Sequence, residues 1–243
     1  MLFILAIASI SFYEFVKMTE NKGTKPNIYF GLPAVLFMIV NVYYRAVDYE
    51  IVILLIVSIT LVIELFRNKD SAINNTGSTL IGIFYIGLFS SSIIGIRELY
   101  SFSYALYPHG GFIIISILVS IWLCDSAAFF LGTAFGKHKL FPRVSPSKSW
   151  EGAVAGFVFS ILGMAAGKAL VIDFLNWDDV IIIGIIIGLF GQIGDLVESL
   201  FKRDCGVKDS SSLIPGHGGI FDRFDSFIFS APLVYLYLYY IAM

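Results

Sequence analysis

The chain has 243 residues, of which 58% are hydrophobic and only 14% are charged. A soluble domain carries roughly a quarter charged residues, so this composition argues against a soluble protein and indicates an all-α polytopic integral membrane protein. The net charge of -2 argues against a nucleic-acid partner, which requires a basic face. The two cysteines, Cys124 and Cys205, show neither metal-ligand spacing nor a disulfide framework.

The first apolar stretch, "MLFILAIASISFYEF", lacks a basic segment at its start and carries Glu14 near its end. A secretory signal begins with such a basic segment. We therefore expect this stretch to be a retained helix.

Windows of roughly 20 apolar residues, long enough to cross about 30 Å of hydrocarbon, predict eight membrane-spanning helices around a polar cavity open to the cytoplasm. They fall near 1–16, 27–44, 50–66, 78–96, 112–135, 152–172, 179–200 and 221–242. The segment 78–96 is polar in its second half, so we expect it to be broken or partly buried in protein. Together the helices predict one membrane domain over 1–243, with mainly scaffold helices in 1–110 and the helices and loops that carry the candidate site residues in 112–243.

The basic residues indicate the orientation, because short cytoplasmic loops retain positive charge. The first, third, fifth and seventh loops hold twelve of them: Lys17, Lys22, Lys25, Arg67, Lys69, Lys137, Lys139, Arg143, Lys148, Lys202, Arg203 and Lys208. The other three loops hold Arg45, Arg97 and Lys168. This asymmetry predicts cytoplasmic odd-numbered loops, with both termini outside.

Three aspartates lie where lipid would make a charge costly. Asp125 is roughly 18 Å along its helix from Lys137, and Asp195 is roughly 10 Å from Lys202, at 1.5 Å per residue. Asp222 opens the last span, and the loop before it is short enough to bring Asp222 back to Asp195. Such groups usually face a cavity and pair with a cation or substrate, although a buried ion pair that only fixes helix packing stays open for Asp125.

Helical spacing groups further oxygen ligands with these aspartates. Asp195, Glu198, Ser199 and Lys202 would share one helix face, as would Asp222, Asp225 and Ser226. Carboxylate and hydroxyl oxygens suit Mg²⁺, which takes one or two protein carboxylates together with phosphate oxygens. The pattern therefore predicts an Mg-phosphate site.

The fifth and seventh loops supply complementary positive charge. In the seventh, Lys202, Arg203 and Lys208 precede three glycines whose N–H groups could approach an anion closely. In the fifth, Ser145-Pro146 is predicted to cap the next helix, placing an anion site beside Lys148. Lys137 and Lys139 are accounted for by the positive-inside rule.

The histidines are less informative. His217 lies between glycines, where it could be a general base, a turn residue or a donor to phosphate, and His109 and His138 show no local pattern. The chain contains neither of the glycine-rich fingerprints of P-loop and Rossmann nucleotide sites.

The stretch "SLFKRDCGVKDSSSLIPGHGGIFDRFD", residues 199–225, resembles the signature of phosphatidate cytidylyltransferases (CDP-diacylglycerol synthases). Every fixed position of that signature is filled: Ser199, Lys202, Arg203, Lys208, Asp209, Pro215, His217, Gly218, Gly219, Asp222, Arg223 and Asp225. The stretch "CDSAAFFLGTAFGKHKLFPRVSPSKSWEG" is similar to a second block of the family. The resemblance covers roughly residues 120–230.

The resemblance implies transfer of CMP from CTP to phosphatidic acid, with release of pyrophosphate and formation of CDP-diacylglycerol. It implies that Asp195 and Asp222 hold the metal, either two ions or Mg²⁺ with K⁺. The other implied site residues contact phosphates or complete the polar cavity: Lys202, Arg203, Lys208, Arg223, Asp125, Ser145, Lys148, Ser199, Asp209, His217, Gly218, Gly219 and Asp225.

The expected location is the plasma membrane of a prokaryote, with the active site facing the cytoplasm and membrane lipids around it; a homodimer is left open. The alternatives are a CDP-archaeol synthase, a polyprenol kinase, and an ion-coupled carrier. Carriers often show repeated halves, and no such repeat is found here.

Overall fold

The structure is a computed structural model that describes residues 1–213, 216 and 218–242. Two compact units can be distinguished, each made of two stretches of chain. Unit 1 comprises Met1–Gly95 and Phe201–Phe224, and unit 2 comprises Ile96–Leu200 and Asp225–Met243. The unit boundaries fall within helices, so α5, α9 and α10 each contribute to both units.

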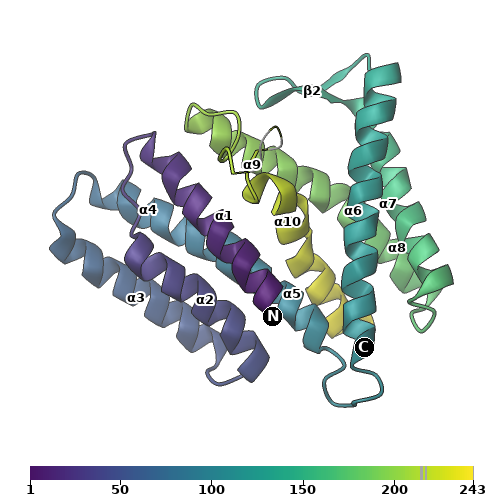
Figure 1. Cartoon of the computed structure of the whole chain (residues 1–243), viewed down its shortest axis with the longest axis horizontal. Helices are drawn as coiled ribbons and strands as arrows, with labels where there is room; N and C mark the ends of the chain where they lie inside the picture. Colours follow the sequence, from purple (N-terminus) through teal and green to yellow (C-terminus); the bar gives the residue numbers. More distant parts are fainter. Residues whose placement is uncertain (214–215, 217, 243) are drawn as a thin grey trace. The chain divides into compact units, whose positions relative to one another are not determined.

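Unit 1 is built on the N-terminal helices (Figure 1). Their bounds are α1 Leu2–Glu20, α2 Ile28–Tyr44, α3 Tyr49–Arg67, α4 Ala72–Gly82, the π-helical η1 Ile83–Leu88, and α5 Phe89–Glu98. Helix α2 packs against α1 and η1, and α3 packs against α4. Side-chain caps begin two of these helices, since Asn27 accepts a hydrogen bond from Phe30 N at 3.2 Å and Ser71 accepts one from Asn74 N at 3.3 Å.

Unit 2 contains the two longest helices, α6 and α7, and a small hairpin. The bounds are α6 Pro108–Phe135, β1 Lys139–Phe141, β2 Ser145–Ser149, α7 Trp150–Leu170, α8 Trp177–Ile186, η2 Ile187–Gly191, α9 Gln192–Asp204, α10 Phe221–Tyr237 and η3 Leu238–Ala242. Strands β1 and β2 pair antiparallel, with Lys139 opposite Ser149 and Phe141 opposite Ser145. This short hairpin is an addition to the predicted all-α architecture.

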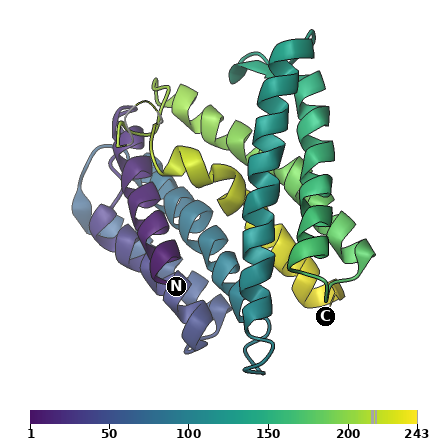
Figure 2. The same cartoon turned by 45° about the vertical axis from the view of Figure 1, so that its right-hand side comes forward.

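Helices α6 and α7 lie side by side in both Figure 1 and Figure 2. Small residues let their backbones approach, which is how helices associate closely in lipid. A Cβ at Gly156 would lie 2.9 Å from the Cys124 carbonyl oxygen, and one at Gly163 would lie 2.9 Å from Ser120 Cα. The glycines of α7 are therefore a packing requirement of this helix pair.

The predicted spans are confirmed as helices. Seven helical segments of the described chain are long and apolar enough to cross a membrane, namely Leu2–Glu20, Tyr49–Arg67, Ala72–Glu98, Pro108–Phe135, Trp150–Leu170, Trp177–Asp204 and Phe221–Ala242. The remaining predicted span is the shorter apolar helix Ile28–Tyr44, with 17 residues. The chain is a polytopic membrane protein.

The segment predicted to be broken or buried, 78–96, is buried but continuous. It belongs to Ala72–Glu98, whose apolar window is 67% buried, the largest share among these seven segments. Instead of breaking, the segment changes to π-helical hydrogen bonding over Ile83–Leu88. Such π turns are often found near functional sites.

Within unit 1, the first, third and seventh loops meet at one end of the helices. Lys25 Nζ lies 2.5 Å from Asp70 Oδ2, and Arg67 Nη1 donates to the Lys25 carbonyl oxygen at 2.9 Å. Lys22 also forms an ion pair with Asp204. These contacts bring the first loop, the third loop and the end of α9 together within this unit.

Candidate active site

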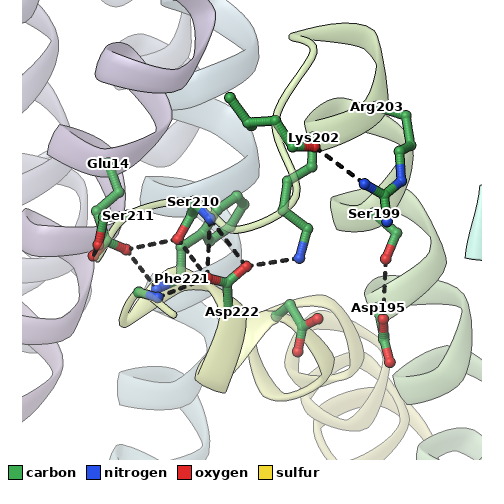
Figure 3. A network of polar contacts seen from close by, with 12 residues as sticks. Glu14, Asp195, Ser199, Lys202, Arg203, Ser210, Ser211, Phe221 and Asp222 are labelled. Atoms are coloured by element: carbon green, nitrogen blue, oxygen red, sulfur yellow. Dashed lines mark hydrogen bonds and ion pairs between the residues drawn. The ribbon is translucent and has the colours of Figure 1, made fainter. Parts of the chain in front are cut away.

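The signature segment of unit 1 closes around the Asp222 carboxylate, in the first turn of α10 (Figure 3). Oδ1 lies 2.7 Å from Lys202 Nζ, and the two side chains are only 12% and 8% exposed. Oδ2 accepts hydrogen bonds from Gly219 N at 2.6 Å, from Ser210 N at 3.0 Å and from Ser210 Oγ at 2.9 Å. The Asp222 carboxylate, at the start of α10, thus contacts both the end of α9 and the seventh loop.

Two glycines of the signature are required by this packing. Gly218 has a φ of +79°, and a Cβ there would lie 2.6 Å from Asp222 Oδ2. A Cβ at Gly219 would overlap the Ser210 hydroxyl and lie 2.5 Å from a carboxylate oxygen of Glu14. We expected the glycine N–H groups to approach an anion, and the anion that Gly219 N contacts here is the Asp222 carboxylate.

Glu14 of α1 contacts this segment, which the sequence pattern did not reveal. It is 2% exposed, and its carboxylate accepts four hydrogen bonds from the segment 210–221. Figure 3 shows Ser210 lying between Glu14 and Asp222. The one available signal was an acidic residue inside an apolar stretch, because a group so costly to bury usually has a specific partner.

An aromatic cluster in unit 1 supports the same region. Phe15 makes edge contacts with Phe201 and Phe221, with ring centroids 6.0 and 6.3 Å apart, and Tyr85 packs against both of these rings at 5.7 Å. Edge-to-face packing is a favourable geometry for aromatic rings. The cluster fixes the end of α9 and the start of α10 against α1 and η1.

In unit 2, Asp195 carries the second set of polar contacts. Its Oδ2 lies 2.6 Å from Lys148 Nζ, with side-chain exposures of 34% and 27%. Ser199 Oγ donates to Asp195 Oδ1 at 3.4 Å, one helical turn further along α9. The predicted helix face bearing Asp195 and Ser199 is confirmed, and Lys148 is brought to it from β2.

Further carboxylates lie near Asp195 within the same unit. Asp225 is 7% exposed, and Asp195, Asp125 and Lys148 all lie close enough to act electrostatically on it. Gly194 permits the close approach of α9 to α10, because a Cβ there would lie 3.0 Å from the Asp225 carbonyl oxygen. The carboxylates of Asp195 and Asp225 therefore lie near one another in this unit, an arrangement that a bound cation would stabilise.

The predicted helix start at Ser145-Pro146 is wrong. Ser145 belongs to strand β2, and α7 begins at Trp150, where Ser149 Oγ accepts a hydrogen bond from Gly152 N at 3.2 Å. The strand continues to Ser149 because the hairpin pairs it with Lys139. The local cap signal was therefore four residues early, and Lys148 lies on the strand immediately before the cap.

The remaining predicted site residues lie mostly on the surface. Arg203, Lys208, Asp209 and Arg223 are exposed, and Arg203 Nη1 donates to the Val207 carbonyl oxygen at 3.3 Å. The predicted roles of Pro215 and His217 fall outside the described residues. Asp195 and Asp222 belong to different units, so their joint site stays a prediction.

The carboxylates differ in how readily they could hold a metal ion. Asp195 is one-third exposed, and its oxygens have acceptor capacity beyond their contacts with Lys148 and Ser199. Asp222 would have to exchange a present donor, such as Lys202 Nζ, for the ion. No group of three or more His, Cys, Asp or Glu side chains is arranged for metal binding within the described part of the chain.

Cys205 lies in the signature loop but is not an activated nucleophile. Burial raises the pKa of its thiol, and the nearby Asp204 raises it further. The thiolate is the reactive form, so this cysteine stays largely protonated near neutral pH.

Together the fold and these contacts define an integral membrane protein whose predicted site residues lie mainly on α9, α10 and the fifth and seventh loops. The chain belongs to the Cytidylyltransferase family, whose profile it matches over residues 1–241.

Curated relatives extend this comparison. The chain is 43% identical over 152 residues to a phosphatidate cytidylyltransferase of Staphylococcus haemolyticus (strain JCSC1435). It is 44% identical over 153 residues to that of Staphylococcus saprophyticus and 43% identical over 153 residues to that of Staphylococcus aureus (strain COL). In each case the alignment covers 62% of this chain and 57% of the relative.

Proposed function

We propose that the protein is a phosphatidate cytidylyltransferase, which transfers CMP from CTP to the phosphate of phosphatidic acid and releases pyrophosphate. The observation that carries the proposal is the Lys202–Asp222 pair inside a complete signature segment, in a chain 43% identical to relatives of that name. The reaction makes CDP-diacylglycerol for phospholipid synthesis.

The residues suit a direct displacement. The phosphate of phosphatidic acid is already a nucleophile near neutral pH, so the protein has to align it with the α-phosphorus of CTP and offset negative charge. Lys148 lies 2.6 Å from Asp195, and Lys202 lies 2.7 Å from Asp222. When substrate binds, each lysine would contact a phosphate as well as its carboxylate. The exposed side chains of Arg203, Lys208 and Arg223 would contact the β- and γ-phosphates of CTP, which leave as pyrophosphate.

We propose Mg²⁺ as the metal, with K⁺ or a second Mg²⁺ as a companion. When bound by Asp195 and Asp222, it would neutralise phosphate charge during transfer. Few protein ligands are needed, because Mg²⁺ takes much of its coordination from phosphate oxygens and water. The nearness of the Asp195 and Asp225 carboxylates to one another supports this choice.

The proposed location is the plasma membrane of a prokaryote, with the site facing the cytoplasm. The basic odd-numbered loops support this orientation. CTP would enter from the cytoplasm and the lipid from the membrane, and a homodimer remains an open arrangement.

Labelled CTP tests the proposal in purified protein with phosphatidic acid, with and without Mg²⁺. We expect the α-phosphate label in the lipid, with pyrophosphate released in equal amount and only when Mg²⁺ is present. Release of CDP with the γ-label in a lipid would identify a kinase. Absence of any lipid-dependent CTP turnover would contradict an enzyme of this class and favour a carrier.

A further inference from the structure

We propose that Glu14 of α1 is a positioning residue for the cytidylyltransferase site, holding the start of α10 and, through Ser210, the Asp222 carboxylate. The inference rests on the proposed function and adds a residue from outside the signature segment. All residues concerned lie in unit 1.

The Glu14 carboxylate acts as a cap for α10 provided by another helix. Oε1 accepts a hydrogen bond from Ile220 N at 3.1 Å, and Oε2 accepts one from Phe221 N at 2.8 Å. The first N–H groups of a helix have no partner within that helix, and a negative group at this end is also favoured by the helix dipole. Glu14 therefore fixes where α10 begins, one residue before Asp222.

Serine hydroxyls connect Glu14 to the loop. Ser211 Oγ donates to Oε1 at 2.6 Å, and Ser210 Oγ lies 3.2 Å from Oε2 of Glu14 and 2.9 Å from Oδ2 of Asp222. A hydroxyl has one hydrogen, so Ser210 can donate fully to only one of the two carboxylates at a time. Its backbone N–H also donates to Asp222 at 3.0 Å, which keeps the residue between them.

Burial makes this arrangement specific. Glu14 is 2% exposed and lies within the apolar helix Leu2–Glu20. A carboxylate is costly to bury unless it is hydrogen-bonded, so the four donors account for its presence there. The adjacent Phe15 packs against the Phe221 ring, so α1 holds α10 through both a polar and an apolar contact.

The test compares Glu14→Gln with Glu64→Gln in the full chain. Glutamine keeps the shape of the side chain but replaces one acceptor oxygen with a donor. Glu64 is the matched control because it is also a buried carboxylate of unit 1, 7% exposed, and its hydrogen bonds go to Arg67 and Asn75. Amide hydrogen exchange and CMP transfer are measured on both variants in detergent.

For Glu14→Gln we expect amide exchange over residues 218–224 to be roughly tenfold faster or more, the scale of one lost hydrogen bond to a charged group. We expect turnover to fall by a similar factor and the Mg²⁺ concentration for half-maximal rate to rise. Glu64→Gln should leave all three quantities near the wild-type values per folded molecule.

The proposal would be overturned if Glu14→Gln kept wild-type turnover and Mg²⁺ dependence, even with faster amide exchange. It would also be overturned if activity fell only in proportion to the amount of folded protein. If Glu14→Gln does not fold, Ser211→Ala is measured in its place. We expect smaller changes in amide exchange, turnover and Mg²⁺ dependence for this variant. If none of these quantities changes, the inference is contradicted. If the wild-type protein shows no CMP transfer, the proposed function fails, while the exchange measurement still decides whether Glu14 holds the start of α10.

Discussion

Neutralising each of the two predicted metal-binding aspartates should separate catalysis from stability. Asp222→Asn and Asp195→Asn should both abolish turnover, but only the first should greatly destabilise the protein. The Lys202–Asp222 pair is 12% and 8% exposed, whereas the Lys148–Asp195 pair is 27% and 34% exposed. Their different burial sets the expected free energies.

Removing one partner of a buried ion pair leaves an uncompensated charge and costs about 3–5 kcal/mol. The partly exposed pair is screened by solvent, and its loss should cost about 1 kcal/mol or less. For a chain of this size, about 3 kcal/mol corresponds to a fall of at least about 6 °C in the melting temperature. We therefore expect Asp222→Asn to melt at least about 6 °C lower and Asp195→Asn to stay within roughly 4 °C of wild type.

A thiol-reactive dye can follow unfolding in detergent, because Cys124 and Cys205 are both buried, at 3% and 8% exposure. The double variant Asp222→Asn with Lys202→Met removes the stranded charge, so it should recover part of the stability without recovering turnover. Equal melting temperatures for the two single variants would refute the argument from burial. Retained turnover in both would refute their assignment as metal ligands.

Two further predictions concern the signature loop. Gly219→Ala should lower both activity and melting temperature, because its methyl group would lie 2.5 Å from a Glu14 oxygen. Gly77→Ala, in helix α4 with nothing within 4 Å, should lower neither, and an equal loss in both variants would contradict this. Cys205 should be alkylated more slowly than an unfolded control near pH 8, because its raised pKa reduces the thiolate fraction, and the difference should shrink as pH rises. Peptide mass mapping separates it from Cys124, and equal rates for folded and unfolded protein at pH 8 would refute the shift.

The membrane helices could be predicted from the sequence because lipid offers no hydrogen bonds to the backbone. Every apolar stretch of spanning length must then satisfy its N–H and C=O groups internally, so hydropathy indicates a helix directly. Once the helix is predicted, its periodicity places residues four apart on one face. This is why the predicted pairing of Asp195 with Ser199 is confirmed, with Ser199 Oγ 3.4 Å from Asp195 Oδ1.

The start of α7 could not be located from local signals. Ser145, Ser147 and Ser149 all precede the helix, and each could act as a cap. The pairing of β1 with β2 and the hydrogen bond from Trp150 N to the His138 carbonyl oxygen at 2.9 Å select Ser149. These contacts join residues on the two sides of the hairpin turn. A cap preference describes only the residues next to the helix start, so it does not include such contacts.

By itself, the sequence determined the membrane class, the helices and the chemical types of the site residues, since these follow from apolar length, local spacing and the signature segment. Only the tertiary structure decided which groups meet: Lys148 with Asp195, Lys202 with Asp222, and Glu14 with the start of α10. Glu14 lies 207 residues before Phe221 in the chain. No local periodicity links positions so far apart, because their contact depends on how the helices of unit 1 pack.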